Sequence, residues 1–158
     1  YSKKYLELFE FRYPNQFQSL VECPEEYLQV PIIKFVLQPI IENYFIHGIR
    51  MRETDNFIRI AVEKDEAYRI IVEDNGQGMS GEELAEKNED LRNDTMKKEA
   101  SIGIANVNRR LKAVYGREYG IHLEAGSGGG LRVILSFRPA EREVEEKTDY
   151  DESDAGGK

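Results

Sequence analysis

Two short segments with alternating apolar side chains limit the folds open to this chain more than any other feature. Residues 58–63 and 68–73 each place an apolar residue at every second position, as a strand with one buried face does. Residues 64–66 (Lys-Asp-Glu) separate them and have turn composition, so we predict an antiparallel hairpin. A doubly wound parallel sheet would need strand–helix–strand alternation throughout, and this hairpin excludes it.

Helical periodicity is the second constraint. Between residues 32 and 47, apolar side chains recur at spacings of three and four; Pro39 is expected to loosen one turn and Gly48 to end the helix. The other predicted elements are a helix end at 1–14, a weak strand at 15–23, a helix at 101–115, and strands at 119–124 and 131–137. This order predicts an α/β fold, a two-layer α/β sandwich whose mixed, mainly antiparallel sheet carries helices on one face.

Two segments lack a regular apolar pattern. Residues 79–100 are polar, and we expect a long loop there; loops of this length within a compact domain are often functional. Residues 140–158 are acidic and have few apolar side chains, which is typical of a disordered tail. The folded domain is therefore predicted to span 15–139.

Composition narrows the classes of function. A net charge of -8 argues against a general nucleic-acid binder, which normally carries a basic face. The single cysteine, Cys23, excludes an internal disulfide framework and a cysteine-based zinc site. No apolar run approaches the ~20 residues that span a bilayer, and no signal peptide is visible. Since the chain opens without Met, we expect a fragment whose membrane anchor, if any, lies upstream.

Three glycine-bearing segments stand at predicted strand ends or helix starts, namely residues 74–78 (DNGQG), 101–107 (SIGIANV) and 126–130 (GSGGG). Glycine at such points lets the backbone approach a ligand closely, and free N–H groups at the start of helix 101–115 can hold phosphate oxygens. Each segment alone is more often an ordinary turn. None fits the P-loop pattern or a strand-linked GxGxxG.

The helix before the hairpin carries polar residues within an apolar stretch. Asn43 and His47 are four residues apart, so they share a helix face. The carbonyl oxygen of Asn43 is a hard ligand suited to Mg2+ beside phosphates and water. Taken alone, Glu42 and His47 are more often a solvated carboxylate and a helix-end histidine.

The order and spacing of these segments carry a family resemblance. Residues 38–48 (QPIIENYFIHG), 74–79 (DNGQGM) and 101–111 (SIGIANVNRRL) together resemble the ATP-binding catalytic domain of sensor histidine kinases. The similarity is greatest to the YesM/LytS-like subgroup, within the wider GHKL (HATPase_c) ATPases. It covers roughly residues 5–139 and implies the GHKL (Bergerat) fold and protein-histidine kinase activity.

The resemblance also implies roles for particular residues. Asn43 would coordinate Mg2+ between the ATP phosphates, and Asp74 would accept a hydrogen bond from the adenine amino group. Residues 79–100 would be the mobile ATP lid, and residues 1–14 the linker from a dimerisation and phosphoacceptor hairpin. The predicted nucleotide-binding set is Asn43, His47, Asp74, Gly76, Gly78, Met79, Gly103, Ile104 and Asn106.

Two positions depart from the family pattern. Leu131 stands where the last glycine box usually has threonine, so that contact with the adenine pocket is lost or replaced, by Ser127 or by water. Pro39 occupies the place of the catalytic glutamate of the hydrolytic relatives. Glu42, beside Asn43 and about 100° round the helix, is therefore the candidate base.

The implied cofactors are ATP and Mg2+. The implied partners are the chain's own dimerisation domain and a response regulator, with a cytoplasmic location and anchoring through segments outside this chain. His47 and His122 both lack the exposed helical setting of a phosphoacceptor, so the acceptor is expected elsewhere. Two alternatives stay open: a GHKL-type ATPase that drives a conformational change, and a degenerate nucleotide-binding interaction module.

Overall fold

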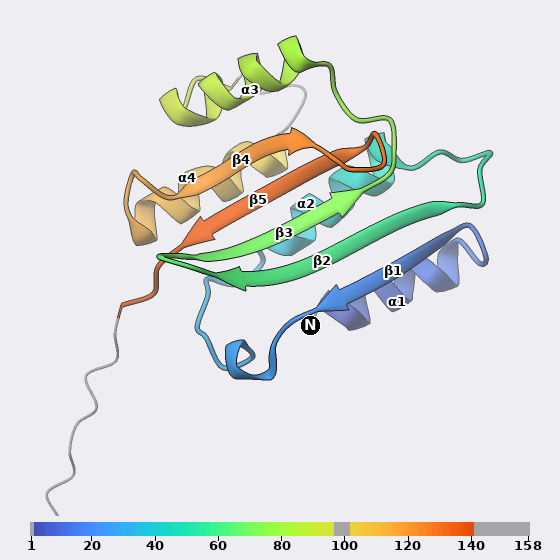
Figure 1. The fold of residues 1–158 in the computed structure, drawn as a ribbon, viewed down its shortest axis with the longest axis horizontal. Coiled ribbons are helices and arrows are strands. Elements are labelled where there is room, and N and C mark those ends of the chain that lie inside the picture. The colour runs from blue at the N-terminus through green and yellow to red at the C-terminus, as the bar shows by residue number, and fades with distance from the viewer. Residues whose placement is uncertain (1, 97–101, 141–158) are drawn as a thin grey trace, which may run out of the picture.

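A computed structural model describes residues 2–96 and 102–140 of the chain. Five strands form one sheet in the order β1-β2-β3-β5-β4 (Figure 1). They are β1 (Phe17–Glu22), β2 (Asn56–Lys64), β3 (Tyr68–Asp74), β4 (Gly120–Ala125) and β5 (Leu131–Phe137). Strand β1 pairs with β2 in parallel, and the other pairings are antiparallel. The predicted hairpin is therefore confirmed, with Ile60 opposite Val72.

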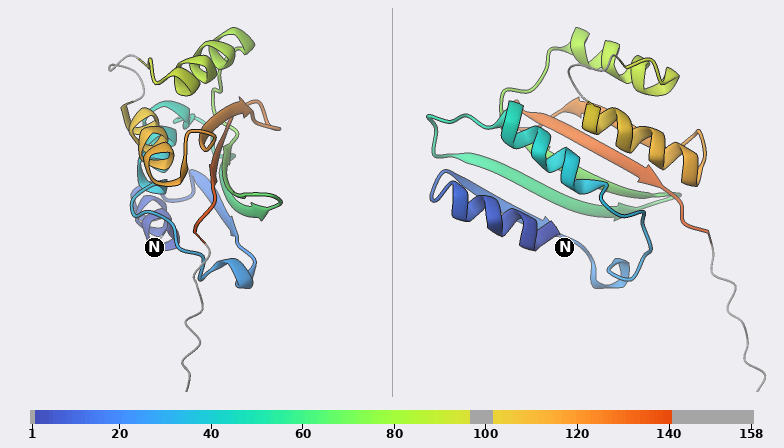
Figure 2. Two further views of the ribbon diagram at one scale, coloured as in Figure 1. Left: turned by 90° about the vertical axis from the view of Figure 1, so that its left-hand side faces the viewer. Right: turned by 180° about the vertical axis from the view of Figure 1, so that it is seen from behind.

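The helices lie on one face of this sheet, which confirms the two-layer architecture. Helix α1 (Ser2–Arg12), helix α2 (Leu37–Asn43) with the π-helical turn η2 (Tyr44–Gly48), and helix α4 (Ile102–Tyr115) cover the same face (Figure 2). A 3-10 turn, η1 (Glu25–Tyr27), follows β1. Among the described residues, no helix combines the length and apolar character needed to cross a membrane.

The hydrophobic core fills the space between sheet and helices. Strand β5 shows why: Leu131, Val133, Leu135 and Phe137 are buried while the residues between them are not, as the two-residue period of a strand requires. Leu111 of α4 and Ile41 of α2 are fully buried against this surface. Burial of these faces fixes the positions of the segments that follow the strands.

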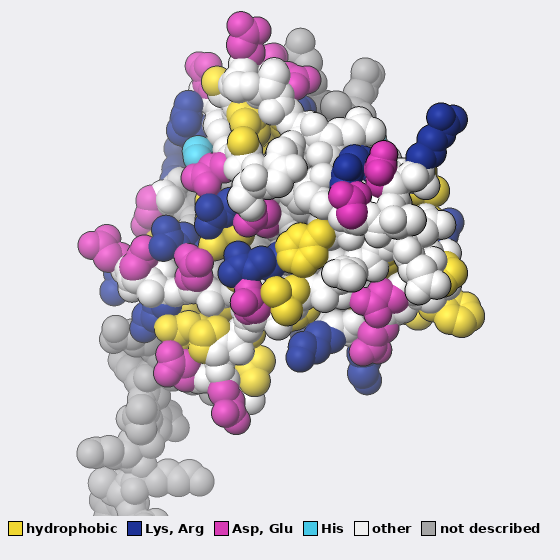
Figure 3. Space-filling view, turned by 45° about the vertical axis from the view of Figure 1, so that its right-hand side comes forward, with side chains coloured by type: hydrophobic (Ala, Val, Ile, Leu, Met, Phe, Trp, Pro, Cys, Tyr) yellow, Lys and Arg dark blue, Asp and Glu magenta, His cyan; other side chains and the backbone are white. Residues whose placement is uncertain are grey.

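The other face of the sheet is open and carries alternating charges. Arg59 of β2 pairs with Glu22 of β1 and lies 4.0 Å from Glu73 of β3, while Arg132 of β5 lies 3.6 Å from Glu124 of β4. The register sets Glu73 opposite both arginines. Opposite charges on facing positions favour this pairing, and Figure 3 shows basic and acidic side chains interspersed over one face of the molecule.

The expectation of a structureless segment at 79–100 is wrong for most of its length. Residues 81–93 form helix α3 (Gly81–Asn93), which lies beyond the β4 edge of the sheet (Figures 1 and 2). Ser80 and Glu83 begin the helix with a capping box. Its buried residues are Leu91 and the polar Asn88, so no apolar stripe marked the helix in the sequence. Residues 97–100 of the predicted lid lie outside the described residues.

The helix predicted at 32–47 begins later than expected. Phe35 has φ 61°, a left-handed backbone that a helix cannot contain, and α2 starts at Leu37. Pro39 falls in the first turn, where its missing N–H breaks no helical bond. The prediction that Pro39 loosens one turn is therefore wrong, and the irregular turn is η2, next to Gly48.

Candidate functional site

Asp74 ends β3 in a buried position where its carboxylate is tied to the backbone. Its side-chain Oδ1 accepts hydrogen bonds from the N–H of Gly76 at 2.8 Å and the N–H of Leu131 at 3.3 Å. In the described part of the chain both bonds go to Oδ1, so Oδ2 is the oxygen left for a ligand donor. Burial disfavours the charged form and raises the pKa of Asp74, against the effect of the two N–H donors.

Glycines allow three chain segments to meet around this carboxylate. A Cβ on Gly76 would lie 2.1 Å from the carbonyl oxygen of Gly48, and a Cβ on Gly130 would lie 2.1 Å from the carbonyl oxygen of Asp74. Gly78 has φ 63° and passes beside Gly129. The turn after α2, the segment after β3 and the glycine loop before β5 therefore converge because side chains are absent there.

Tyr44 lies beside the same site, and the sequence patterns did not single it out. Its ring is 2.8 Å from the position of a Gly48 Cβ, and Asp74 Oδ1 is 3.7 Å from that position. The Tyr44 hydroxyl is buried and has no hydrogen-bond partner among the described residues. Burial, followed by the negative charge of Asp74, raises the pKa of Tyr44. In the sequence Tyr44 stands among apolar residues, so its position predicted only a place in the core.

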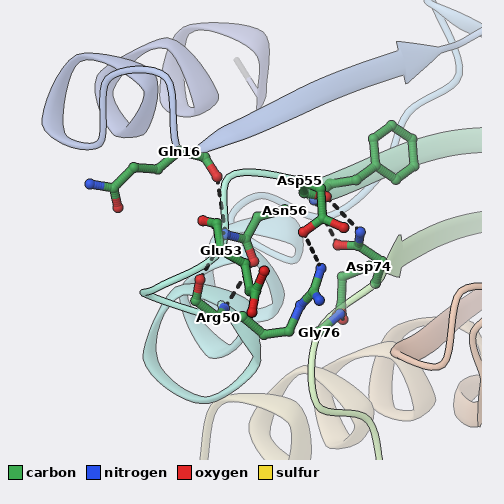
Figure 4. A network of polar contacts seen from close by, with 9 residues as sticks. Gln16, Arg50, Glu53, Asp55, Asn56, Asp74 and Gly76 are labelled. Carbon is green, nitrogen blue, oxygen red and sulfur yellow. Dashed lines mark hydrogen bonds and ion pairs between the residues drawn. The ribbon is translucent and has the colours of Figure 1, made fainter.

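A polar network holds the segment between η2 and β2 next to Asp74 (Figure 4). The buried Asn56 amide donates to the carbonyl oxygens of Gln16, Arg50 and Glu53 at 2.9–3.0 Å, and its oxygen accepts from the Arg50 N–H. Arg50 also pairs with Asp55 at 2.7 Å. A lone asparagine at a strand start gave no sequence signal of this role.

Asn75 adds a second link between strands next to the site. Its Nδ2 donates to the carbonyl oxygen of Asp55 at 2.7 Å, and its Oδ1 accepts from the N–H of Phe57 at 2.7 Å. Within residues 74–76, the Gly76 N–H therefore positions the buried carboxylate, and the Asn75 side chain links the same segment to β2.

The predicted residues of α2 differ in their surroundings. Asn43 ends the helix, is partly exposed, and makes no side-chain hydrogen bond with the described residues. Glu42 accepts from the Tyr5 hydroxyl at 2.6 Å and from Gln38 Nε2 at 3.1 Å. His47 is exposed on η2.

The donor set fits Mg2+ only as part of a nucleotide complex. No group of three or more His, Cys, Asp or Glu residues within 2–96 and 102–140 is arranged to hold a metal. The free carboxamide oxygen of Asn43 is a single hard ligand, and Mg2+ is usually held by few protein ligands together with phosphates and water.

The predicted residues of the second glycine segment lie at the start of α4. Gly103 packs against Pro39 of α2, since a Cβ there would lie 3.0 Å from the Pro39 Cβ. Ile104 is buried in the core, and the side chain of Asn106 is exposed. The Ile104 side chain is apolar, so the polar groups to consider at this end are the first N–H groups of α4, which have no partner within the helix.

The two remaining predictions concern Met79 and Ser127. Met79 is half-buried against the core just after Gly78. Ser127 does not reach the Asp74 carboxylate, because its N–H and hydroxyl both donate to Glu73, at 2.9 and 2.6 Å. The suggestion that Ser127 takes over an adenine-pocket contact stays a prediction, and the Leu131 backbone N–H is the group from that strand end that bonds to Asp74.

Comparison with known families matches residues 31–141 to the histidine kinase-, DNA gyrase B- and HSP90-like ATPase family. The sensor histidine kinase/phosphatase LytS of Staphylococcus aureus is 33% identical over 148 residues, covering 91% of this chain and 24% of LytS. The chain therefore spans about a quarter of the length of this relative.

Solved structures show the same fold at lower identity. The catalytic domain of the histidine kinase ThkA has a TM-score of 0.61 at 17% identity, over 85% of this chain and 88% of that one. The ATP-binding domain of PrrB from Mycobacterium tuberculosis has a TM-score of 0.55 at 19% identity, with the same coverage. These similarities establish the arrangement of sheet and helices.

Proposed function

The chain belongs to the histidine kinase-, DNA gyrase B- and HSP90-like ATPase family and is a histidine kinase catalytic domain, and on this premise we propose how its site works. It binds ATP with Mg2+ and transfers the γ-phosphoryl group to a histidine of a dimerisation domain outside this chain. The observation that carries the proposal is the Asp74 carboxylate, which is buried and, among the described residues, is hydrogen-bonded through Oδ1 alone.

Asp74 would make the site prefer adenine over guanine. Because Oδ1 already accepts two backbone N–H groups, Oδ2 is the oxygen that would accept a hydrogen bond from the exocyclic amine of the base. Guanine presents a carbonyl oxygen at that place, and two acceptors facing each other repel. The glycines packed round Asp74 hold the carboxylate rigid, which limits the entropy lost on binding.

Asn43 and the start of α4 are the proposed phosphate end of the site. Asn43 would contribute its carboxamide oxygen to Mg2+, and a bound Mg2+ would neutralise charge on the phosphates. The first N–H groups of α4 would donate to phosphate oxygens, and Gly103 lets this helix start lie close to Pro39 of α2. His47, Gly76, Gly78, Met79 and Asn106 remain proposed members of the nucleotide site.

Glu42 is the proposed base for the transfer. As the bond from the γ-phosphorus to the ADP oxygen breaks, the unprotonated nitrogen of the neutral imidazole forms the new bond to phosphorus, and the proton on the other ring nitrogen passes to the Glu42 carboxylate. Oε1 of Glu42 already accepts two hydrogen bonds, so Oε2 is the oxygen for this proton. Products are ADP and phosphohistidine.

The proposed partners follow from the family. The dimerisation domain would be joined through residues 1–14, and a response regulator would receive the phosphoryl group. The cytoplasmic location, the membrane attachment of the parent protein and the lid role of residues 79–100 stay predictions.

Calorimetry with ATP and GTP, on the wild type and Asp74→Asn, tests the proposal. The asparagine oxygen keeps the two backbone N–H groups, which turns its NH2 toward the adenine amine as donor against donor. We expect ATP affinity to fall about ten- to a hundredfold, as for a hydrogen bond to a charged group, and GTP affinity to rise. Equal affinity of the wild type for ATP and GTP contradicts this assignment.

Asn43→Ala is the matched variant at the other end of the site. It should remove the Mg2+-dependent part of ATP binding and leave adenosine affinity nearly unchanged. If adenosine affinity falls as much as ATP affinity, Asn43 is a structural residue.

A further inference from the structure

Helix α1 contacts the proposed catalytic glutamate, although 37 positions separate the two in the sequence. The hydroxyl of Tyr5 donates to Glu42 Oε1 at 2.6 Å, and this bond is partly buried. Resting on the function proposed above, we propose that Tyr5 is a positioning residue for Glu42, and that α1 is a working part of the site.

Aromatic packing fixes α1 in the position that this contact requires. The rings of Phe9 and Phe45 stack at 3.9 Å and are nearly parallel, and the ring of Tyr13 lies parallel to both, 6.4 Å from Phe9 and 5.9 Å from Phe45. Tyr5 meets Phe9 edge to face at 5.2 Å. Leu6, between them in the sequence, is buried in the core. Because Phe45 follows Glu42 by three residues, the same stack that holds α1 also orients the carboxylate's own helical turn.

The two donors to Glu42 come from different helices, so they restrain its carboxylate relative to different parts of the fold. Gln38 lies one turn earlier on α2 and binds the same Oε1 at 3.1 Å, so it moves with Glu42. Tyr5 belongs to α1, so its hydrogen bond fixes the position of the Glu42 carboxylate relative to a second helix. With Oε1 taken by both donors, Oε2 is turned away from them and is the oxygen available to the proton of the nucleophile. A displacement of α1 would break the hydrogen bond from Tyr5 to Glu42 and keep the one from Gln38.

Tyr5→Phe tests the proposal, since it removes the hydroxyl and keeps the ring in the aromatic packing. ADP release from ATP is measured with the acceptor domain supplied in trans. We expect kcat to fall about tenfold, the size of one hydrogen bond to a charged group, with the KM for ATP unchanged. Tyr13→Phe is the matched control, because the Tyr13 ring also packs on Phe45 but its hydroxyl is not among the donors to Glu42 in the described residues. It should leave both constants unchanged.

The Glu42→Gln background separates positioning from a structural effect. If Tyr5 acts through Glu42, Tyr5→Phe should cause no further loss from the residual rate of Glu42→Gln. An equal loss in both backgrounds, or a change in KM instead of kcat, overturns the proposal.

A readout without nucleotide distinguishes this proposal from the function on which it rests. In protein labelled with 13C at glutamate carboxyl carbons, the Glu42 signal should shift with Tyr5→Phe and stay in place with Tyr13→Phe. A chain that binds no ATP contradicts the proposed function while this shift still reports the contact. An unmoved Glu42 signal in Tyr5→Phe overturns the positioning role whether or not ATP binds.

Discussion

Glu73 and Asp74 are adjacent residues whose pKa values move in opposite directions. Asp74 faces the helices, where burial raises its pKa. Glu73 faces the open side of the sheet, where the Ser127 hydroxyl and N–H donate to it and lower its pKa, with further help from Arg132 and Arg59. The two-residue period of β3 alone separates the two environments.

This contrast predicts opposite pH dependence of folding stability for the two carboxyls. Because the folded-state pKa of Asp74 lies above the unfolded value of 3.8, its contribution to stability is present below that value and is lost as the pH rises through the folded-state pKa. At neutral pH the buried charge therefore costs stability. Asp74→Asn should raise the free energy of unfolding at neutral pH, and this gain should shrink toward acid pH.

Glu73→Gln is the matched comparison, measured by urea denaturation over the same pH series. The lowered pKa of Glu73 gives stability that is present above its unfolded value of 4.5 and is lost as the pH falls through the folded-state pKa. This variant should therefore be destabilised at neutral pH and approach the wild type in acid. Equal destabilisation of Asp74→Asn at every pH would refute the role of burial at that residue.

At the scale of elements, helix α3 is attached to the sheet edge by polar side chains. Asn88 of α3 donates to the carbonyl oxygen of Leu123 and accepts from its N–H, both at 2.8 Å. Asn108 of α4 makes the corresponding link, donating to Leu91 of α3 and accepting from Ile121 of β4. The two buried amides thus pair the free edge of β4 and join both helices to it.

Asn88→Ala should detach α3 from β4. The change leaves both backbone groups of Leu123 without their partner, and the expected loss in the free energy of unfolding is about 2–4 kcal/mol. Urea denaturation measures the loss, and hydrogen exchange should show faster exchange in residues 81–93. His122 stands directly before Leu123 on β4 and is exposed. His122→Ala should therefore change stability by less than about 0.5 kcal/mol. Unchanged exchange in α3 would mean that Leu91 and the capping box hold it without Asn88.

At the scale of the whole molecule, the nucleotide site and the histidine that accepts the phosphoryl group are proposed to lie in different domains. Neither histidine of the chain lies on a regular α-helix, the setting of a phosphoacceptor: His47 is on the irregular turn η2, and His122 is on β4, 3.8 Å from Glu124. Supplied with radiolabelled ATP and Mg2+, the chain should therefore not label itself, and should label a separately added dimerisation domain of its parent protein. Stable, acid-labile phosphate on His47 or His122 would place the acceptor within this chain instead.

Elements that are stabilised by a regular apolar face could be predicted from the sequence, because their pattern lies within a few neighbouring residues. The hairpin of β2 and β3, the strands β4 and β5, and helix α4 all follow from spacings of two or of three and four. The segment Asp74–Gly78 was also visible, since glycines directly after a strand mark a place where the backbone can turn and come close to a ligand. The separation of an open charged face from a buried one follows from the same alternation.

Tertiary structure alone decided the features that depend on contacts across long stretches of sequence. Helix α3 buries a polar Asn88 whose partner lies 35 residues away, and the bond from Tyr5 to Glu42 joins two helices across 37 residues. Tyr44, whose hydroxyl has no hydrogen-bond partner in the described part of the chain, likewise lies near Asp74 only because η2 and β3 meet. Hydrogen bonds between distant side chains and backbone groups leave no repeating pattern in the sequence, because each one stabilises a single pairing of residues and not a whole face of an element.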